Sequence, residues 1–245
     1  MGKITCVICG KAISGKYLLD PWGNPACLSH KNIMCCSCFR FIGKYSSYSP
    51  VTKQIGFNLA DGRYVCGLCQ ETSVANKEQV KKSADFVLNL LAKAGFNIPH
   101  GKISVSLVTQ TEMEKKSPGA RGLCCSQFLV GHPETTTAKI YIHHGLPKMV
   151  FEGTLAHEIL HFWLHYNGIE ESESEEGFCN IGKALVQNYY AAIHGSEFAA
   201  KLRQWANENP DYYYGTKFLE QKQILQNMGW EKYIENILRN KKLPK

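Results

Sequence analysis

The sequence has no uninterrupted apolar run of about 18 or more residues, which is the length that a membrane-spanning helix needs. Its first residues, MGKITCVICG, contain a cysteine pair instead of the apolar stretch of a signal peptide. No internal repeat is present, and the one biased stretch is the acidic EESESEE at 170–176. These absences exclude membrane-spanning and secreted proteins, and they predict a cytoplasmic location with no membrane partner.

The 245 residues are 44% hydrophobic, enough for one ordinary domain and a small one. Eight of the 11 cysteines fall in the first 69 residues without a secretory signal, so metal binding is favoured over disulfides. Of the formal charge of +7, +5 belongs to residues 1–74. Two Zn²⁺ held by seven thiolates would reduce the charge of that segment to about +2, so no nucleic-acid partner is expected.

The chain changes character after residue 74. Residues 1–74 are short segments between turn residues, without long helical periodicity, and must be held together by metal. From Asn76 the apolar residues follow one helical face up to Gly95. We therefore predict a small zinc-stabilised domain at 1–74 and a second domain at 75–245.

The second domain is predicted to be α+β, with strands first and helices afterwards. Strands are expected at 103–110 and 138–145, with a loop containing SPGARG and a third strand, CCSQFLVG, between them. Helices are expected at 149–167, 175–194, 196–207, 215–228 and 230–240.

The sequence HEILH at 157–161 fits the HExxH motif. Two histidines one helical turn apart present their rings to one Zn²⁺, and the adjacent glutamate reaches the water that the metal activates. We assign His157 and His161 as ligands and Glu158 as general base. The alternative is a helix whose histidines are ordinary surface or core residues, but the flanking apolar residues and the stop at Asn167 and Gly168 fit an anchored metal helix.

A catalytic zinc needs a third protein ligand and one open position. A second helix begins 14 residues after His161, and Glu176 in its first turn is our choice, because Glu-Gly-Phe resembles the ligand-bearing segment of many zinc peptidases. Glu175, Glu173 and His165 remain alternatives. The spacing is shorter than in thermolysin-like enzymes.

Hydrolysis also needs a donor for the developing oxyanion. The candidates are Tyr214, His194, Tyr189 and Tyr190, and we choose Tyr214 because it lies in a loop between helices.

Four ligand pairs occupy the N-terminal segment, enough for two closed tetrahedral zinc sites: Cys6 with Cys9, Cys27 with His30, Cys35 with Cys38, and Cys66 with Cys69. The short gap between His30 and Cys35 favours tandem sites, with the first two pairs on one zinc and the last two on the other, over a cross-braced pairing. The segment resembles a LIM domain, with CxxH where HxxC is usual. Cys36 is left over and is interpreted as a packing residue.

The combination resembles the DA-type family, the ubiquitin-activated LIM-domain peptidases that limit organ growth in plants, and their bacterial relatives. CLSH, CCSC and ADGRYVC are similar to the family's second zinc module, and RGLC, HHGLPKMVFEGTLAHEILHFWLHYNG, EEGFC, YG at 214–215 and LQNMGWEKYIENIL to its peptidase domain. The resemblance implies a gluzincin-like zinc endopeptidase with protein substrates, and ubiquitin or a ubiquitinated protein as a partner. We find no counterpart of the plant members' ubiquitin-interacting helices and first LIM domain, so control by ubiquitin is a hypothesis.

We therefore expect a zinc metallopeptidase with one catalytic and two structural Zn²⁺. The alternative is a non-enzymatic LIM-type adaptor with a degenerate peptidase domain, which would have no need of Glu158. A DNA-associated zinc protease would need a basic stripe, and the charge argues against it. Cys124 and Cys125 allow two interpretations. One of their thiolates caps the catalytic zinc in an inactive state, or both are core residues of a strand, and we prefer the core role.

Overall fold

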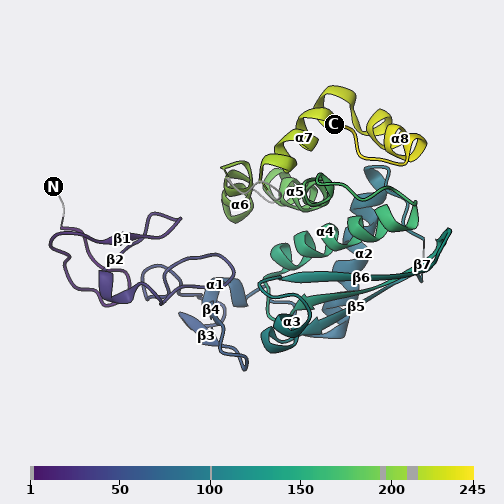
Figure 1. Cartoon of the computed structure of the whole chain (residues 1–245). Coiled ribbons are helices and arrows are strands. Elements are labelled where there is room, and N and C mark those ends of the chain that lie inside the picture. Colours follow the sequence, from purple (N-terminus) through teal and green to yellow (C-terminus); the bar gives the residue numbers. More distant parts are fainter. Residues whose placement is uncertain (1–2, 100, 194–196, 209–214) are drawn as a thin grey trace. The chain divides into compact units, whose positions relative to one another are not determined.

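A computed structural model describes residues 3–99, 101–193, 197–208 and 215–245 (Figure 1). The chain divides into two compact units. The first comprises Met1–Ala75, Thr109–Thr111 and His144–Lys148, and the second comprises Asn76–Val108, Glu112–His143 and Met149–Lys245. The prediction placed the domain boundary at residue 74.

The first unit is made of very short elements. Its two small antiparallel sheets are β1 (Leu18–Leu19) with β2 (Pro25–Ala26) and β3 (Gly56–Asn58) with β4 (Tyr64–Cys66), and its helices are the 3₁₀ turn Leu28–His30 and α1 (Gly67–Gln70). One of its apolar clusters consists of Cys6, Val7, Ala26 and Phe41. This cluster is small for a segment of this length, and the cysteines gathered in the unit could bind metal that adds to its stability.

The second unit is built on a three-stranded sheet of order β5-β7-β6 (Figure 1). β5 (Ile103–Val108) runs parallel to the central β7 (His132–His143), and β6 (Gly122–Leu129) runs antiparallel to it. The inward residues of β7 alternate along the strand, and Ala138, Ile140 and Ile142 are buried. Because β7 is the central strand, β5 and β6 are the edge strands of this sheet.

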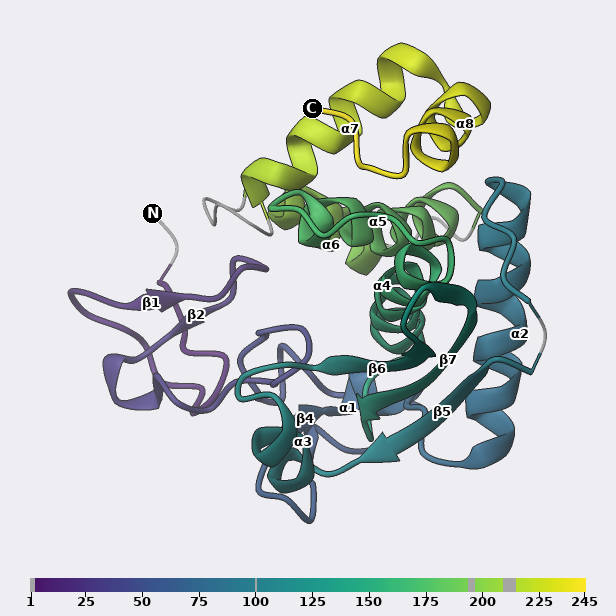
Figure 2. The same ribbon diagram turned by 45° about the vertical axis from the view of Figure 1, so that its right-hand side comes forward.

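Helices cover one side of this sheet (Figure 2). α2 (Lys77–Lys93) begins with a capping box formed by Asn76 and Gln79. α4 (Lys148–Tyr166) lies between the sheet and α5 (Glu175–Ile193), and α6 (Glu197–Glu208), α7 (Lys217–Met228) and α8 (Trp230–Asn240) follow. Residues on nearly all sides of α4 are buried, because α4 is the central helix of the unit.

Two glycines let α5 approach its neighbours closely. A Cβ atom on Gly182 would lie 2.9 Å from the backbone oxygen of Ala156 on α4. A Cβ atom on Gly177 would lie 2.4 Å from the backbone carbon of Lys217, at the start of α7. Gly182 therefore allows α5 to lie close to the helix that carries HEILH, and Gly177 allows it to lie close to α7.

The mixed α and β architecture with small sheets and several helices confirms the predicted fold class. The predicted loop after β5 was wrong in part, because α3 (Gln110–Lys116) forms there. The strand predicted at 138–145 begins six residues earlier, at His132. None of the helices in the described ranges combines the length and the apolar character needed to cross a bilayer.

Candidate metal centre and active site

Three ligand atoms converge between α4 and α5. The Nε2 atoms of His157 and His161 lie 3.2 Å apart. The Glu176 carboxylate lies 3.2 Å from Nε2 of His157 through Oε2 and 3.5 Å from Nε2 of His161 through Oε1. The two histidines are one turn apart on α4, and Glu176 is in the first turn of α5. The structure thus brings together the three residues that the sequence predicted as ligands.

The Nδ1 atoms of His157 and His161 face hydrogen-bond acceptors. Nδ1 of His157 is 3.1 Å from Oδ1 of Asn180, and Nδ1 of His161 is 2.8 Å from Oε1 of Glu175. These oxygens accept a hydrogen bond, so Nδ1 carries the proton and Nε2 presents a lone pair. Burial by itself would lower the pKa of His161, but the bond to Glu175 and the nearby carboxylates raise it. Such partners on the far nitrogen are typical of metal-binding histidines.

The donor set fits a zinc ion. Two Nε2 lone pairs and a carboxylate that face one point repel one another unless a cation lies between them. A tetrahedron with bonds of about 2.0 to 2.1 Å to nitrogen and oxygen has edges of about 3.3 to 3.4 Å, close to the distances between the three residues. Oε2 of Glu176 is buried and has no hydrogen-bond donor among the described residues. These residues could therefore hold a metal ion.

The alternative third ligands lie elsewhere. Glu175 contacts the far nitrogen of His161 and so orients the ring. Nε2 of His165 is 4.0 Å from the Glu175 carboxylate and is not part of the three-residue cluster. Glu173 is exposed in the loop between α4 and α5. The geometry favours Glu176 over all three.

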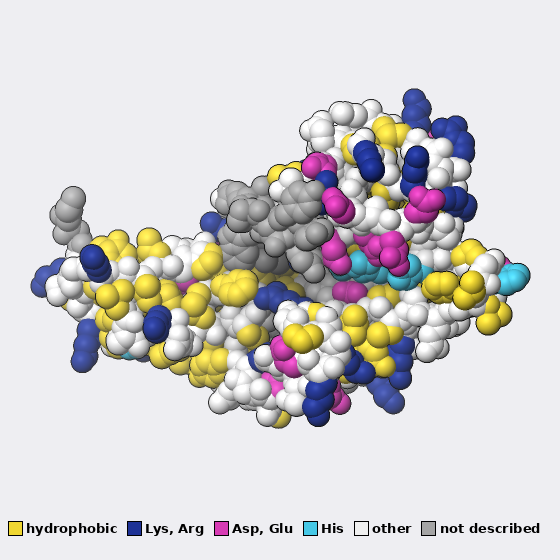
Figure 3. All heavy atoms as spheres, viewed as in Figure 1, with side chains coloured by type: hydrophobic (Ala, Val, Ile, Leu, Met, Phe, Trp, Pro, Cys, Tyr) yellow, Lys and Arg dark blue, Asp and Glu magenta, His cyan; other side chains and the backbone are white. Residues whose placement is uncertain are grey.

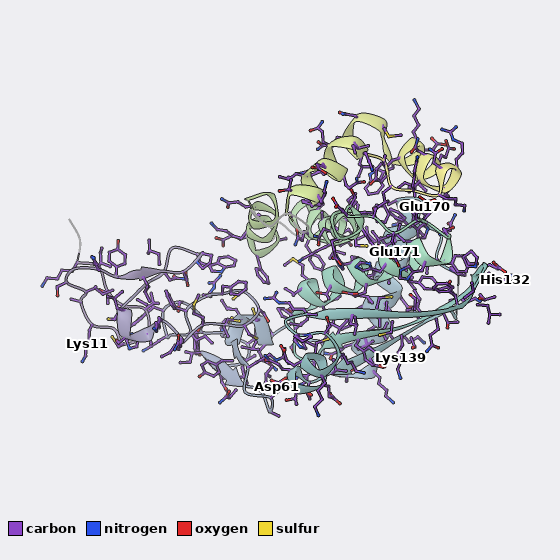
Figure 4. The ribbon with its side chains drawn as sticks, in the orientation of Figure 1. Lys11, Asp61, His132, Lys139, Glu170 and Glu171 are labelled. Carbon is purple, nitrogen blue, oxygen red and sulfur yellow. The ribbon has the colours of Figure 1, made fainter. Side chains whose placement is uncertain are left out.

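The loop between α4 and α5 is acidic and exposed. Glu170 and Glu171, both labelled in Figure 4, are exposed. In the space-filling view, acidic side chains lie directly beside histidine side chains between the sheet and the C-terminal helices (Figure 3).

The general-base candidate is buried against the edge strand. Glu158 is 7% exposed, and this burial raises the pKa of its carboxyl group. The backbone of Cys124 on β6 forms a hydrogen bond that acts in the opposite direction. A Cβ atom on Gly122 would lie 2.6 Å from Oε1 of Glu158 and 2.5 Å from Cγ2 of Thr154. The glycine of RGLC therefore leaves room for the carboxylate.

The oxyanion donor is not located among the described residues. Tyr214 and His194 lie outside them. The Tyr190 hydroxyl donates to Oε2 of the buried Glu152 at 2.7 Å, and the Tyr189 ring packs 4.9 Å from that of Phe86. Tyr190 therefore forms a structural hydrogen bond, and Tyr189 packs against an aromatic ring.

The N-terminal ligands form two clusters in the tandem pairing, Cys6, Cys9, Cys27 and His30, and then Cys35, Cys38, Cys66 and Cys69. The Sγ atoms of Cys9 and Cys27 are 4.0 Å apart, and those of Cys38 and Cys66 are 3.7 Å apart. A tetrahedron with Zn–S bonds of about 2.3 Å has edges of about 3.8 Å. Each cluster could therefore hold a zinc ion.

Backbone N–H groups stabilise the thiolate form of these cysteines. The N–H of Cys27 donates to Sγ of Cys6, and the N–H of Cys66 donates to Sγ of Cys35. Burial would raise the pKa of Cys6, but amide donors outweigh it and lower the value to about 6. Such a thiol binds metal readily near neutral pH.

The remaining cysteines do not join these clusters. Burial raises the pKa of Cys124 to about 12, so its thiol stays protonated, and its Sγ lies 3.6 Å from the Ser126 hydroxyl. This environment supports the core role of Cys124, whereas Cys125 is exposed, so the core role predicted for it is wrong. Cys36 contacts Ser37.

Sequence reasoning missed Asn180 and Gly122. Asn180 follows Glu176 by one helical turn, so the spacing that placed a ligand on α5 also placed a partner for His157 on the same face. Gly122 belongs to RGLC, but its role depends on how closely β6 approaches α4, which no local pattern encodes.

Comparisons with known proteins match the part of the chain that carries this site. The family model DA1-like, described as Protein DA1, matches residues 105–186. Protein DA1-related 2 of Arabidopsis thaliana is 27% identical over 205 residues, which cover 68% of this chain and 37% of the relative. LIM domain-containing protein HDR3 of Oryza sativa subsp. japonica is 24% identical, over 68% of this chain and 39% of the relative.

The chain therefore spans well under half the length of the curated relatives it matches. No solved structure shows a significant match. The matched range of the family model includes β6, the HEILH helix and the glutamates at the start of α5. Together with the curated relatives, it shows that this part of the chain is similar to the DA1-like family.

Proposed function

We propose that the chain is a zinc-dependent endopeptidase that hydrolyses peptide bonds of protein substrates. The observation that carries the proposal is the buried carboxylate of Glu158 beside the convergent atoms of His157, His161 and Glu176. These last three residues would hold the catalytic zinc, and the two N-terminal clusters would hold two structural zinc ions. The cytoplasmic location stays a prediction.

Each residue has a definite task in this proposal. A bound zinc ion would lower the pKa of water and polarise the substrate carbonyl. Glu158 accepts the proton of the attacking water and passes it to the leaving amine. Its raised pKa suits both transfers, because an acid-base group works best when its pKa lies nearer to the working pH. Asn180 and Glu175 hold the imidazole rings.

The edge strand supports a peptide as substrate. Among the described residues β6 pairs only with β7, so its other edge can accept an extended chain through backbone hydrogen bonds. The strand begins at Gly122, which abuts Glu158. A peptide added along this edge would pass the general base with its backbone extended.

The burial of Glu158 argues against a non-enzymatic adaptor. A buried carboxylate reduces the stability of the fold unless it is compensated. An adaptor gains nothing from this cost, whereas a hydrolase requires a base at this position.

The test compares the zinc-loaded wild type with Glu158→Gln on a denatured protein library, with new termini identified by mass spectrometry. We expect the wild type to produce new internal termini and the variant to be slower by about 100-fold or more, with zinc content unchanged. A wild type that generates no termini, or a fully active Glu158→Gln, would refute the proposal.

We further propose ubiquitin, free or attached to a protein, as a regulatory partner, which rests on the family resemblance. Titration of ubiquitin into the labelled chain, with cleavage followed in parallel, tests it. Neither binding nor a change in cleavage rate would remove ubiquitin from the account.

A further inference from the structure

A pocket of about 290 Å³ opens beside the candidate catalytic residues. His157 and Glu158 line it from α4, and Asn180, Lys183 and Gln187 line it from α5. Arg121, directly before β6, lines it as well. The pocket thus adjoins the position where a scissile bond would lie, and two of its side chains are cationic.

The packing of the helices aims Lys183 at this pocket. The Cγ atom of Lys183 lies 3.4 Å from where a Cβ atom on Gly153 would stand, so its stem crosses α4 at a glycine. In the described part of the chain, Lys183 forms no ion pair with an acidic side chain. Within the described ranges, no carboxylate is therefore bonded to its ammonium group.

The two cations are held near each other at an electrostatic cost. Lys183 is exposed, but the surrounding atoms reduce the hydration of its ammonium group and the guanidinium of Arg121 repels it. These two effects lower its pKa to about 8, although the Glu158 carboxylate in the same pocket acts in the opposite direction. A negative charge in the pocket would relieve this repulsion. The amide side chains of Asn180 and Gln187 add hydrogen-bonding groups to the same wall.

We propose that Arg121 and Lys183 form a subsite for a carboxylate of the peptide substrate. This inference rests on the proposed peptidase function and names its specificity. The carboxylate is the side chain of an Asp or Glu next to the scissile bond, which agrees with an endopeptidase, or the C-terminus of the substrate, which would make the chain a carboxypeptidase instead. Both sources present the same planar anion, which guanidinium and ammonium groups bind through charged hydrogen bonds.

The test uses the zinc-loaded full chain and peptides of one cleaved sequence with Glu, Gln or Lys beside the scissile bond, each as a C-terminal acid and as an amide. We expect kcat/KM to favour Glu over Gln by about tenfold. Lys183→Met should remove most of this ratio, and Lys183→Glu should reverse it in favour of Lys. If the subsite binds the C-terminal carboxylate instead, kcat/KM for the C-terminal acid exceeds that for the amide by the same factor. The peptides with Glu, Gln and Lys then have equal kcat/KM values.

Lys139→Met is the matched control, because Lys139 is a surface lysine of β7 that does not line this pocket (Figure 4). It should leave every ratio unchanged. A wild type that cleaves all peptides equally would overturn the subsite while the peptidase function stands.

A binding measurement separates the two proposals. Fluorescent peptides of the same series are titrated into zinc-loaded Glu158→Gln and into its Lys183→Met derivative. Tighter binding of acidic peptides that is lost in the derivative supports the subsite, even if the wild type cleaves nothing. Equal binding of Glu, Gln and Lys peptides, with acid and amide also equal, would refute it.

Discussion

At the scale of single residues, each histidine of the candidate metal centre divides its two ring nitrogens between two tasks. Nε2 faces the shared centre, and Nδ1 is fixed by Asn180 or Glu175. The neighbouring glutamates 175 and 176 thereby have different roles, because adjacent positions on a helix point about 100° apart.

Lys183 gives a prediction about pH. Its pKa is lowered to about 8, so it is charged below that pH and neutral above it, and the charged groups that face it are Arg121 and Glu158. We expect the preference for Glu over Gln peptides to decline as the pH rises through about 8. The ratio of kcat/KM values for the two peptides between pH 6 and 9.5 measures it, because other titrations affect both peptides equally.

Lys183→Arg is the control, since a guanidinium stays charged throughout this range. It should keep the preference at high pH. A wild-type ratio that is constant across the range would contradict the assignment of Lys183.

The sequence indicated part of this site and left part of it open. HEILH identifies His157, Glu158 and His161, because the motif states both the residue types and their helical spacing. The choice between Glu175 and Glu176 depends on the rotation of α5 about its axis, which tertiary packing determines. Lys183 and Arg121 line one pocket but come from segments distant in the sequence, so no local pattern predicted their proximity.

At the scale of elements, the site depends on how closely α5 and β6 approach α4. Helical periodicity predicted α2, because Val80, Val87 and Leu91 lie on one apolar face, whereas α4 is buried on nearly all sides and its end was indicated by Asn167 and Gly168. It missed α3, whose seven residues bury only Met113 and therefore show no apolar stripe. It also missed the first part of β7, HPETTT, whose polar residues are typical of a turn.

Gly177→Ala tests the packing of α5 on α7. The added methyl group would lie 2.4 to 2.6 Å from backbone atoms of Lys217 and Phe218, which cannot rotate away. We expect the free energy of unfolding to fall by about 1 to 3 kcal/mol in chemical denaturation of the zinc-loaded chain.

Gly153→Ala is the matched control on α4. There the new Cβ atom meets its nearest neighbour at 3.4 Å, an ordinary contact. Its stability should be unchanged or higher, by up to about 1 kcal/mol, because alanine favours a helix. Equal losses in both variants would contradict the close approach at Gly177.

Gly122→Ala tests the approach of β6 to the general base. The methyl group would displace either the Glu158 carboxylate or the strand, since it would lie 2.6 Å from Oε1. We expect kcat to fall by about tenfold to 100-fold with the zinc content unchanged. The exposed Gln127 of the same strand provides the control, and activity of Gln127→Ala should match the wild type. Full activity of Gly122→Ala would contradict the proposed position of the base.

At the scale of the whole molecule, the two compact units differ in what stabilises them. The second has a sheet and helices around buried aromatic residues such as Phe96, Trp163 and Phe178. The first has short strands and two ligand clusters. The cysteine spacing predicted this contrast from the sequence, whereas the inclusion of residues 109–111 and 144–148 in the first unit depends on tertiary contacts.

Removal of metal should therefore affect the units differently. We expect a chelator to make residues 3–75 accessible to a protease, because that segment lacks a sufficient apolar core, while residues 77–93 and 148–166 stay protected. Limited proteolysis with mass spectrometry measures both, and re-addition of zinc should restore protection. Uniform protection of residues 3–75 after complete removal of zinc would contradict a structural role for the two clusters.

The zinc content of the purified chain tests the metal centre most directly. We predict three zinc ions per chain in the wild type by elemental mass spectrometry, and two in Glu176→Ala. Glu175→Ala should keep three at saturating zinc, with affinity at the third site reduced by about tenfold to 100-fold, and the exposed Glu171→Ala should match the wild type. Three zinc ions in Glu176→Ala, or two in the wild type, would contradict the assignment of His157, His161 and Glu176 as the catalytic metal site.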